Sequence, residues 1–355
     1  MAVIRESAPL LSALILMLVG LVLLSRVRSD GAVPLGKFAS MFIQGNPLTA
    51  FGSLIRYRFT GDEDNRVWIT ERMGRARNPL TIVEMIEAMQ DPSFNVRHEA
   101  VIAASRMPPE PRLVSALIEV LTGSEPDLSI SAAWALGNMR AKTAILPLRE
   151  TMWSDYPLLQ ARSARALGML GDNGIVPFLL ERLKTENDEG LRIAYASALG
   201  MLRCPQATDL LLPILRRTSR QTQRGELSLA LARILGFEPN YIRVFRRLRN
   251  DPTTATAQAV LALRKDLPRL LGRDRQLADL VKKCARTFGR DDFHTACKLL
   301  ADIIRTVLSR QIDPLCAQVL GECGDRLDEI DPQRREYIIL SLHAIYVALE
   351  QARNR

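Results

Sequence analysis

The sequence predicts an all-α protein, an α-solenoid of stacked helical hairpins preceded by one transmembrane helix. Small-residue landmarks recur every 31 to 36 residues through the middle of the chain, which indicates a repeated helical unit. Leu and Ala are abundant while aromatic residues make up only 5%, a balance that suits packed helices better than sheets. A run of uncharged, mostly apolar residues lies close to the N-terminus.

Residues 1–30 are predicted to be a membrane anchor. Their uncharged run would extend about 28 Å as a helix, close to the ~30 Å hydrocarbon core of a bilayer. A cleaved signal peptide is the alternative, but the run ends in Arg26 and Arg28 rather than at a small-residue cleavage site. Lys37 adds to that basic flank, whereas Arg5 alone precedes the span. The positive-inside rule therefore places the rest of the chain in the cytoplasm.

Residues 31–75 are predicted to form an amphipathic juxtamembrane linker. It alternates apolar side chains with Lys37, Arg56 and Arg58. The apolar residues are Phe38, Met41, Phe42, Leu48, Phe51, Leu54, Ile55 and Phe59. Two interpretations stay open, because short helices of this kind either lie on a bilayer surface or pack on the first repeat.

Residues 76–240 are predicted to contain about five helical hairpins. The landmarks are Ala104-Ser105, Leu136-Gly137, Leu167-Gly168, Leu199-Gly200 and Leu235-Gly236. Each follows an Ala-rich segment and precedes a Leu-rich one. No hairpin buries both of its faces alone, so neighbouring hairpins must stack. We expect the landmark glycines at helix C-caps, where a left-handed residue closes the helix.

The repeats resemble those of a known family. The pattern Asp91, Val96-Arg97, Ala100 and Ala104, with a similar one from Asp188 to Gly200, looks like HEAT repeats of the phycobilin-lyase type. The resemblance implies a HEAT-like α-solenoid, and such repeats mostly bind other proteins. Residues 1–240 also resemble the final membrane helix and cytoplasmic HEAT tail of some bacterial major facilitator transporters. That resemblance implies a regulatory tail or a separated subunit.

Residues 241–355 are predicted to form an irregular basic helical extension that caps the solenoid. Apolar spacing predicts helices over 241–249, 254–270, 275–288, 292–310, 313–324 and 332–353. We expect residues 331–355 to form a closing helix with a polar outer face. The excess of positive charge is concentrated in residues 241–310, which hold 16 basic and 7 acidic side chains.

The candidate contacts with an anionic membrane surface lie in that basic segment. They are Arg243, Arg246, Arg247, Arg249, Lys282 and Lys283. A solvated face is the other interpretation of such a run of charges. Nucleic acid is disfavoured because few aromatic residues accompany these side chains.

Residues typical of catalysis do not gather in the sequence. Phosphate-binding, zinc-protease and serine-hydrolase motifs are missing, and five cysteines without C-x-x-C spacing indicate buried thiols. His294 and Cys297 are three apart, but a metal site would need two further ligands. We therefore expect no catalytic residues, no metal and no cofactor.

The candidate partner-binding residues lie on the inner helices. Aligning the helices on their landmarks gives Trp134, Arg162 and Arg165 as the best anchors for a protein partner, because Trp and Arg dominate binding hot spots. Burial of Trp134 in the core is the alternative. The sequence thus predicts a single-pass, membrane-anchored scaffold that binds a protein at the cytoplasmic face. The alternatives are a transporter tail and a phycobilin-lyase-like enzyme.

Overall fold

The computed structural model describes residues 45–272, 274–329 and 335–353, and within these ranges the regular structure is entirely helical. The predicted anchor, residues 1–30, and the start of the predicted linker lie outside the described residues. Within the described ranges, every helix is either too short or too polar to cross a bilayer. The contacts divide the chain into two compact units, one ending at Ala116 and the other beginning at Leu117.

The first unit is built on the close packing of α4 (Glu63–Ala76) against α3 (Pro47–Phe59) and α6 (Phe94–Ala104). A short helix, α5 (Ile82–Ala88), completes the hairpin with α6, and α7 (Pro111–Leu121) crosses the boundary between the units. Gly74 of α4 lies so close to α6 that an added Cβ would meet the Cβ of Ala103 at 2.6 Å. Helix packing therefore begins within the predicted linker, before residue 76.

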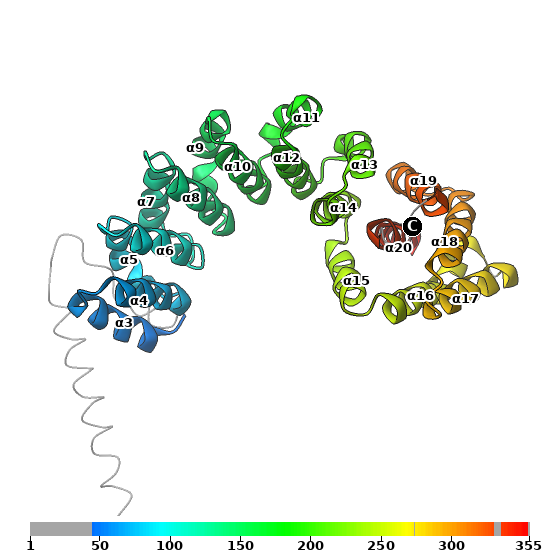
Figure 1. Ribbon diagram of the computed structural model, residues 1–355, viewed down its shortest axis with the longest axis horizontal. Helices are drawn as coiled ribbons and strands as arrows, with labels where there is room; N and C mark the ends of the chain where they lie inside the picture. Colours follow the sequence, from blue (N-terminus) through cyan, green and yellow to red (C-terminus); the bar gives the residue numbers. More distant parts are fainter. Residues whose placement is uncertain (1–44, 273, 330–334, 354–355) are drawn as a thin grey trace, which may run out of the picture. The chain divides into compact units, whose positions relative to one another are not determined.

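The second unit begins with a row of inner helices, each packed against the next. Figure 1 shows this row as α8, α10, α12 and α14, with α9, α11 and α13 outside it. The inner helices are α8 (Pro126–Asn138), α10 (Pro157–Leu170), α12 (Glu189–Met201) and α14 (Gln221–Leu235). The outer helices are α9 (Ile145–Glu150), α11 (Val176–Thr185) and α13 (Thr208–Arg217). The predicted HEAT-like stack of hairpins is confirmed.

The landmark glycines hold the inner helices together at close range. A Cβ added to Gly137 would lie 2.9 Å from the Cα of Ala166, and one added to Gly168 would lie 2.9 Å from the Cα of Ala198. At Gly200 the corresponding distance to Ala230 is 2.6 Å. Side-chain carbons do not approach a backbone this closely, so only glycine permits this spacing between helices.

The prediction that these glycines form the C-caps is therefore wrong for three of them. Gly137, Gly168 and Gly200 lie inside their helices, which continue beyond each of them. Gly236 does follow the end of its helix, with a φ of 97°. In α8, α10 and α12, the left-handed residue comes three positions after the landmark glycine, at Arg140, Gly171 and Arg203.

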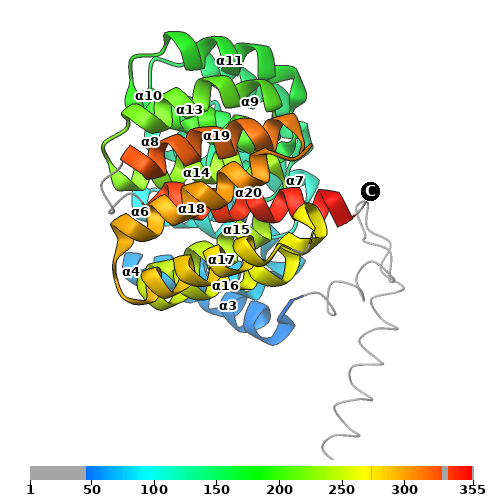
Figure 2. The same ribbon diagram turned by 90° about the vertical axis from the view of Figure 1, so that its right-hand side faces the viewer.

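Six helices follow the inner row and confirm the segments predicted for the last third of the chain. They are α15 (Glu238–Asn250), α16 (Pro252–Leu271), α17 (Arg275–Gly289), α18 (Phe293–Leu308), α19 (Pro314–Glu329) and α20 (Arg335–Arg353). Figures 1 and 2 show α20 among the others, and it contacts α14, α15, α16, α18 and α19. Residues 336–345 of α20 are all buried, so the expectation of a closing helix with a polar outer face is wrong.

Buried polar groups join α20 to α14. Nε of Arg224 lies 3.3 Å from a carboxylate oxygen of Glu336, and both side chains are almost fully buried. The Nε2–H group of His343 donates to the carbonyl oxygen of Gly236 at 2.9 Å. Burial lowers the pKa of His343 to about 4 despite this bond. The central helix is thus held by specific polar contacts as well as by apolar packing.

An arginine and methionine groove on the repeat stack

The three inner helices α8, α10 and α12 end in the same way. Three residues after the landmark glycine, the backbone turns left-handed at Arg140 (φ 55°), Gly171 (φ 74°) and Arg203 (φ 52°). The N–H of each of these residues donates to the carbonyl oxygen of the landmark glycine, at 3.1, 3.2 and 3.0 Å respectively. We call Arg140, Gly171 and Arg203 the cap residues.

Arginine is a costly choice for a cap residue. The left-handed conformation costs an L-residue other than glycine about 1–2 kcal/mol. Gly171 shows that glycine closes the same turn in this chain. Because strain of this kind is often retained at functional sites, the two arginines direct attention to the surface that they share.

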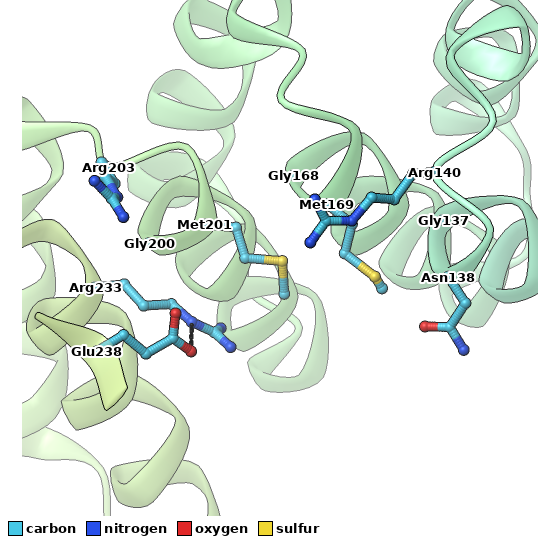
Figure 3. Close-up of a pocket in the computed structure, with 10 residues that line it drawn as sticks. All are labelled: Gly137, Asn138, Arg140, Gly168, Met169, Gly200, Met201, Arg203, Arg233 and Glu238. Atoms are coloured by element: carbon cyan, nitrogen blue, oxygen red, sulfur yellow. Dashed lines mark hydrogen bonds and ion pairs between the residues drawn. The ribbon is translucent and has the colours of Figure 1, made fainter. Parts of the chain in front are cut away.

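That surface carries a groove with a volume of about 410 Å³. Figure 3 shows that its side chains come from the C-terminal ends of four consecutive inner helices and from the start of α15. The lining residues are Gly137, Asn138, Arg140, Gly168, Met169, Gly200, Met201, Arg203, Arg233 and Glu238. Three landmark glycines and two of the cap residues, Arg140 and Arg203, thus line the groove, whereas Gly171 is not part of the lining.

Positive charge dominates the groove. Arg140 and Arg203 are exposed, and among the described residues neither has an ion-pair partner. Arg233 is engaged differently, because its Nε donates to the carboxylate of Glu238 at 2.8 Å. Glu238 is the one acidic residue in the lining. The groove therefore presents two free guanidinium groups toward solvent.

Two methionines supply the apolar part of the groove. Met169 and Met201 follow directly after landmark glycines and are half-buried. Methionine side chains adapt to varied apolar surfaces, and guanidinium groups bind carboxylates through paired hydrogen bonds. The lining holds no serine, cysteine, histidine or lysine. Its chemistry suits the binding of a segment that has both carboxylate and apolar side chains.

The predicted partner anchors lie on the same helices but outside this lining. Trp134 on α8 and Arg162 on α10 are half-buried. Arg165 on α10 forms an ion pair at 2.5 Å with Glu226 of α14, so the pair reaches across α12. Arg165 lies one turn before Met169 in the sequence of α10 and is not part of the groove lining. The role predicted for these three residues stays a prediction.

The predicted basic contacts fall on two helices. Arg243, Arg246, Arg247 and Arg249 are all exposed on α15. On α17, Lys283 is exposed, while the half-buried Lys282 lies 3.5 Å from the carboxylate of Asp279. Contact of these residues with anionic lipid stays a prediction.

The cysteines are packing residues. All five are buried, as predicted, and burial raises the pKa of Cys316 and of Cys323 to about 12. His294 is exposed while Cys297 is buried, so these two do not present a shared face. In the described residues, no group of three or more His, Cys, Asp or Glu side chains is placed to hold a metal ion.

A signal for the cap residues was present in the sequence. The motifs Gly137-Asn-Met-Arg140, Gly168-Met-Leu-Gly171 and Gly200-Met-Leu-Arg203 place one glycine and two arginines at the same offset. A position that alternates between glycine and a long basic residue suggests a left-handed turn facing solvent. The register of the landmarks favours earlier positions on each helix, such as Trp134 and Arg165, and so does not indicate the cap residues.

Known proteins are similar to parts of this chain. The HEAT repeats family profile matches residues 82–162, 114–199 and 147–232. Residues 82–232 are thus similar to HEAT repeats, which agrees with the resemblance noted in the sequence.

Two curated proteins are related in sequence. A bilin biosynthesis protein, PecE of Mastigocladus laminosus, is 34% identical over 119 residues, which cover 31% of this chain and 43% of that protein. A HEAT repeat-containing taxis protein of Halobacterium salinarum is 31% identical over 137 residues, covering 39% of this chain and 30% of that protein. The chain spans less than half the length of either relative.

One solved structure is similar in part. It is the complex of CpcE and CpcF of phycocyanin lyase from Nostoc, with 18% identity and a TM-score of 0.39. The match covers 60% of this chain and 85% of that one.

Proposed function

We propose that this protein is a non-catalytic adaptor whose groove binds an acidic segment of a protein partner. The observation that carries the proposal is the pair of strained, exposed arginines, Arg140 and Arg203, placed at equivalent ends of α8 and α12. Their guanidinium groups have no ion-pair partner among the described residues. A carboxylate from outside would therefore bind without displacing an existing contact.

The length and lining of the groove favour a peptide over a small ion as its ligand. It extends over four consecutive inner helices, and the methionines between the arginines offer apolar contacts. In an extended peptide with carboxylates on either side of an apolar side chain, the carboxylates would bind the arginines and the apolar side chain would contact the methionines. The HEAT repeats of residues 82–232 agree with such a role, since helical-repeat proteins commonly bind partners on extended surfaces.

Residues 1–30 complete the proposal as a single-pass anchor. Their uncharged apolar run and basic flank favour a span with the repeats in the cytoplasm. In this arrangement the adaptor holds its partner at the cytoplasmic face of a membrane. The alternative of a transporter tail rests on the same N-terminal residues and stays a prediction.

Binding of a labelled acidic peptide tests the groove. Fluorescein-labelled hexaglutamate should bind the full-length chain, as measured by fluorescence anisotropy, and labelled hexalysine should not. Each charge-assisted hydrogen bond contributes about 1.5–3 kcal/mol, so Arg140→Gln with Arg203→Gln should weaken hexaglutamate binding about tenfold or more.

A matched control separates the groove from total charge. Arg112→Gln with Arg217→Gln removes two other exposed arginines and changes the net charge equally, yet it should leave the affinity near that of the unmodified chain. Equal weakening by the two double variants would reduce the interaction to non-specific attraction and contradict the proposal.

A bilin-related function is a second candidate, favoured by the sequence similarity to the bilin biosynthesis protein PecE. It predicts that the full-length chain changes the absorbance spectrum of an added bilin in a saturable manner. Absence of any spectral change at a large excess of protein would remove this candidate and leave the adaptor proposal unaffected.

A further inference from the structure

Helix α3 has two apolar faces, and only one of them is covered. Ala50 and Ser53 are buried and Leu54 and Tyr57 are half-buried, on the side of α3 that packs against α4. The other face carries a row of exposed apolar side chains. These are Leu48, Phe51, Ile55 and Phe59, with exposed fractions of 86%, 60%, 48% and 86%. We call these four residues the α3 stripe.

Trp68 on the neighbouring helix α4 has cationic neighbours. It is 45% exposed, and the guanidinium carbons of Arg56 and Arg72 lie 5.7 and 5.2 Å from its ring centroid. Arg56 comes from the last turn of α3, so Trp68 and the helix of the stripe are linked by this stacking. A tryptophan flanked by arginines beside exposed apolar residues is typical of the headgroup layer of a membrane.

Two of the acidic residues close to Trp68 in sequence, Asp62 and Glu63, make hydrogen bonds within the first unit. Asp62 accepts from the backbone N–H of Asn65 as the N-cap of α4. Glu63 accepts from Ser93 and Asn95, each at 2.8 Å. Asp64 is exposed and lines the hollow beside Trp68. Arg56 and Arg58 are exposed at the end of α3, and Arg58 lies 3.6 Å from the carboxylate of Glu84. The cations beside the stripe are therefore Arg56 and Arg72, which both stack on Trp68.

We propose that the α3 stripe and Trp68 insert into the headgroup layer of an anionic lipid bilayer. Three observations name this occupant: the exposed apolar side chains, the adjacent arginines, and an uncharged apolar run that ends only about twenty residues before α3 in the sequence. The arginines meet lipid phosphates while the apolar side chains enter the acyl boundary. This inference rests on the membrane attachment proposed above.

Tryptophan fluorescence tests the inference in the full-length chain. The three tryptophans are Trp68, Trp134 and Trp153, so the first 67 residues contribute no signal. In vesicles of phosphatidylcholine and phosphatidylglycerol with brominated acyl chains, emission should be quenched. Trp68→Phe should remove most of the quenched component. Trp153→Phe is the matched control, because Trp153 is also exposed (69%) and also stacks with an arginine, and it should leave the quenching in place.

A second pair of variants tests the stripe itself. Phe51→Glu with Phe59→Glu should abolish the quenching of Trp68, whereas Leu146→Glu with Leu158→Glu, two exposed leucines of the second unit, should not.

Sedimentation with the same vesicles measures attachment separately. Attachment without quenching of Trp68 would overturn this inference and leave the proposed anchor standing, while failure to attach would overturn both. If Trp68 is shielded from aqueous acrylamide in the absence of lipid, protein covers the stripe instead of lipid, which also contradicts the inference.

Discussion

The repeat stack and the C-terminal helices bury their cores in different ways. In the stack, each inner helix packs on its two neighbours, and glycine–alanine contacts such as Gly200 on Ala230 set the spacing. In the C-terminal part, a single helix, α20, contacts five others. The stack therefore depends on a contact repeated from layer to layer, whereas the C-terminal helices depend on one shared helix.

The largest expected effects come from charges placed in the two cores. Ile345 of α20 and Leu199 of α12 are both fully buried. Ile345→Asp and Leu199→Asp should each lower the free energy of unfolding by about 4 kcal/mol or more. Hydrogen exchange should separate them, with faster exchange from α14 to α20 in the first variant and from α10 to α14 in the second. If hydrogen exchange in Ile345→Asp became faster in α20 alone, α20 would not be the shared packing element of the C-terminal helices.

The buried histidine predicts a pH dependence that belongs to the C-terminal helices. Burial lowers the pKa of His343 to about 4 in the folded protein, so protons bind it more readily in the unfolded chain. Neutral His343 contributes its full share to the free energy of unfolding above the ordinary histidine pKa of about 6.5. As the pH falls from about 6.5 to about 4, the free energy of unfolding decreases by up to about 3 kcal/mol. Chemical denaturation at pH 7 and pH 4.5 measures the loss. His343→Gln should show a shallower loss, and an unchanged slope would contradict the assignment.

Two glycine substitutions test the repeated contact in the stack. Gly200→Ala forces a Cβ toward the backbone of Ala230 and should cost about 1–3 kcal/mol. Gly225→Ala is the matched change, because Gly225 lies within α14 with nothing within 4 Å of an added Cβ. It should stabilise the protein by up to about 1 kcal/mol. Thermal unfolding of both variants gives the comparison, and equal shifts would mean that close approach does not explain the landmark.

The two regions also differ in how far the sequence predicts them. Landmark spacing located the hairpins of the stack, and apolar spacing located all six C-terminal helices, because both signals are local. The central position of α20 was not predictable in this way. Its partners lie far apart in sequence. Its polar residues Glu336 and His343 are buried against Arg224 and Gly236, which also come from a distant segment.

The groove was predicted only in part. The inner helices were expected to carry the binding surface, and the groove does lie on them. The expected anchors Trp134, Arg162 and Arg165 lie outside its lining, because the helix ends turn the cap residues toward solvent. The register of a helix predicts its faces, but not the direction of a left-handed residue after its last turn.

The most direct test of the groove uses the cap residue that lacks a charge. Gly171 lies between Arg140 and Arg203 in the series, and nothing lies within 4 Å of an added Cβ there. Gly171→Arg should cost about 1–2 kcal/mol of stability and should tighten hexaglutamate binding to the full-length chain severalfold. Gly171→Gln, with the same backbone strain and no charge, should not tighten it. Unchanged affinity in Gly171→Arg, or equal tightening in both variants, would contradict the account of the groove as a site for acidic segments.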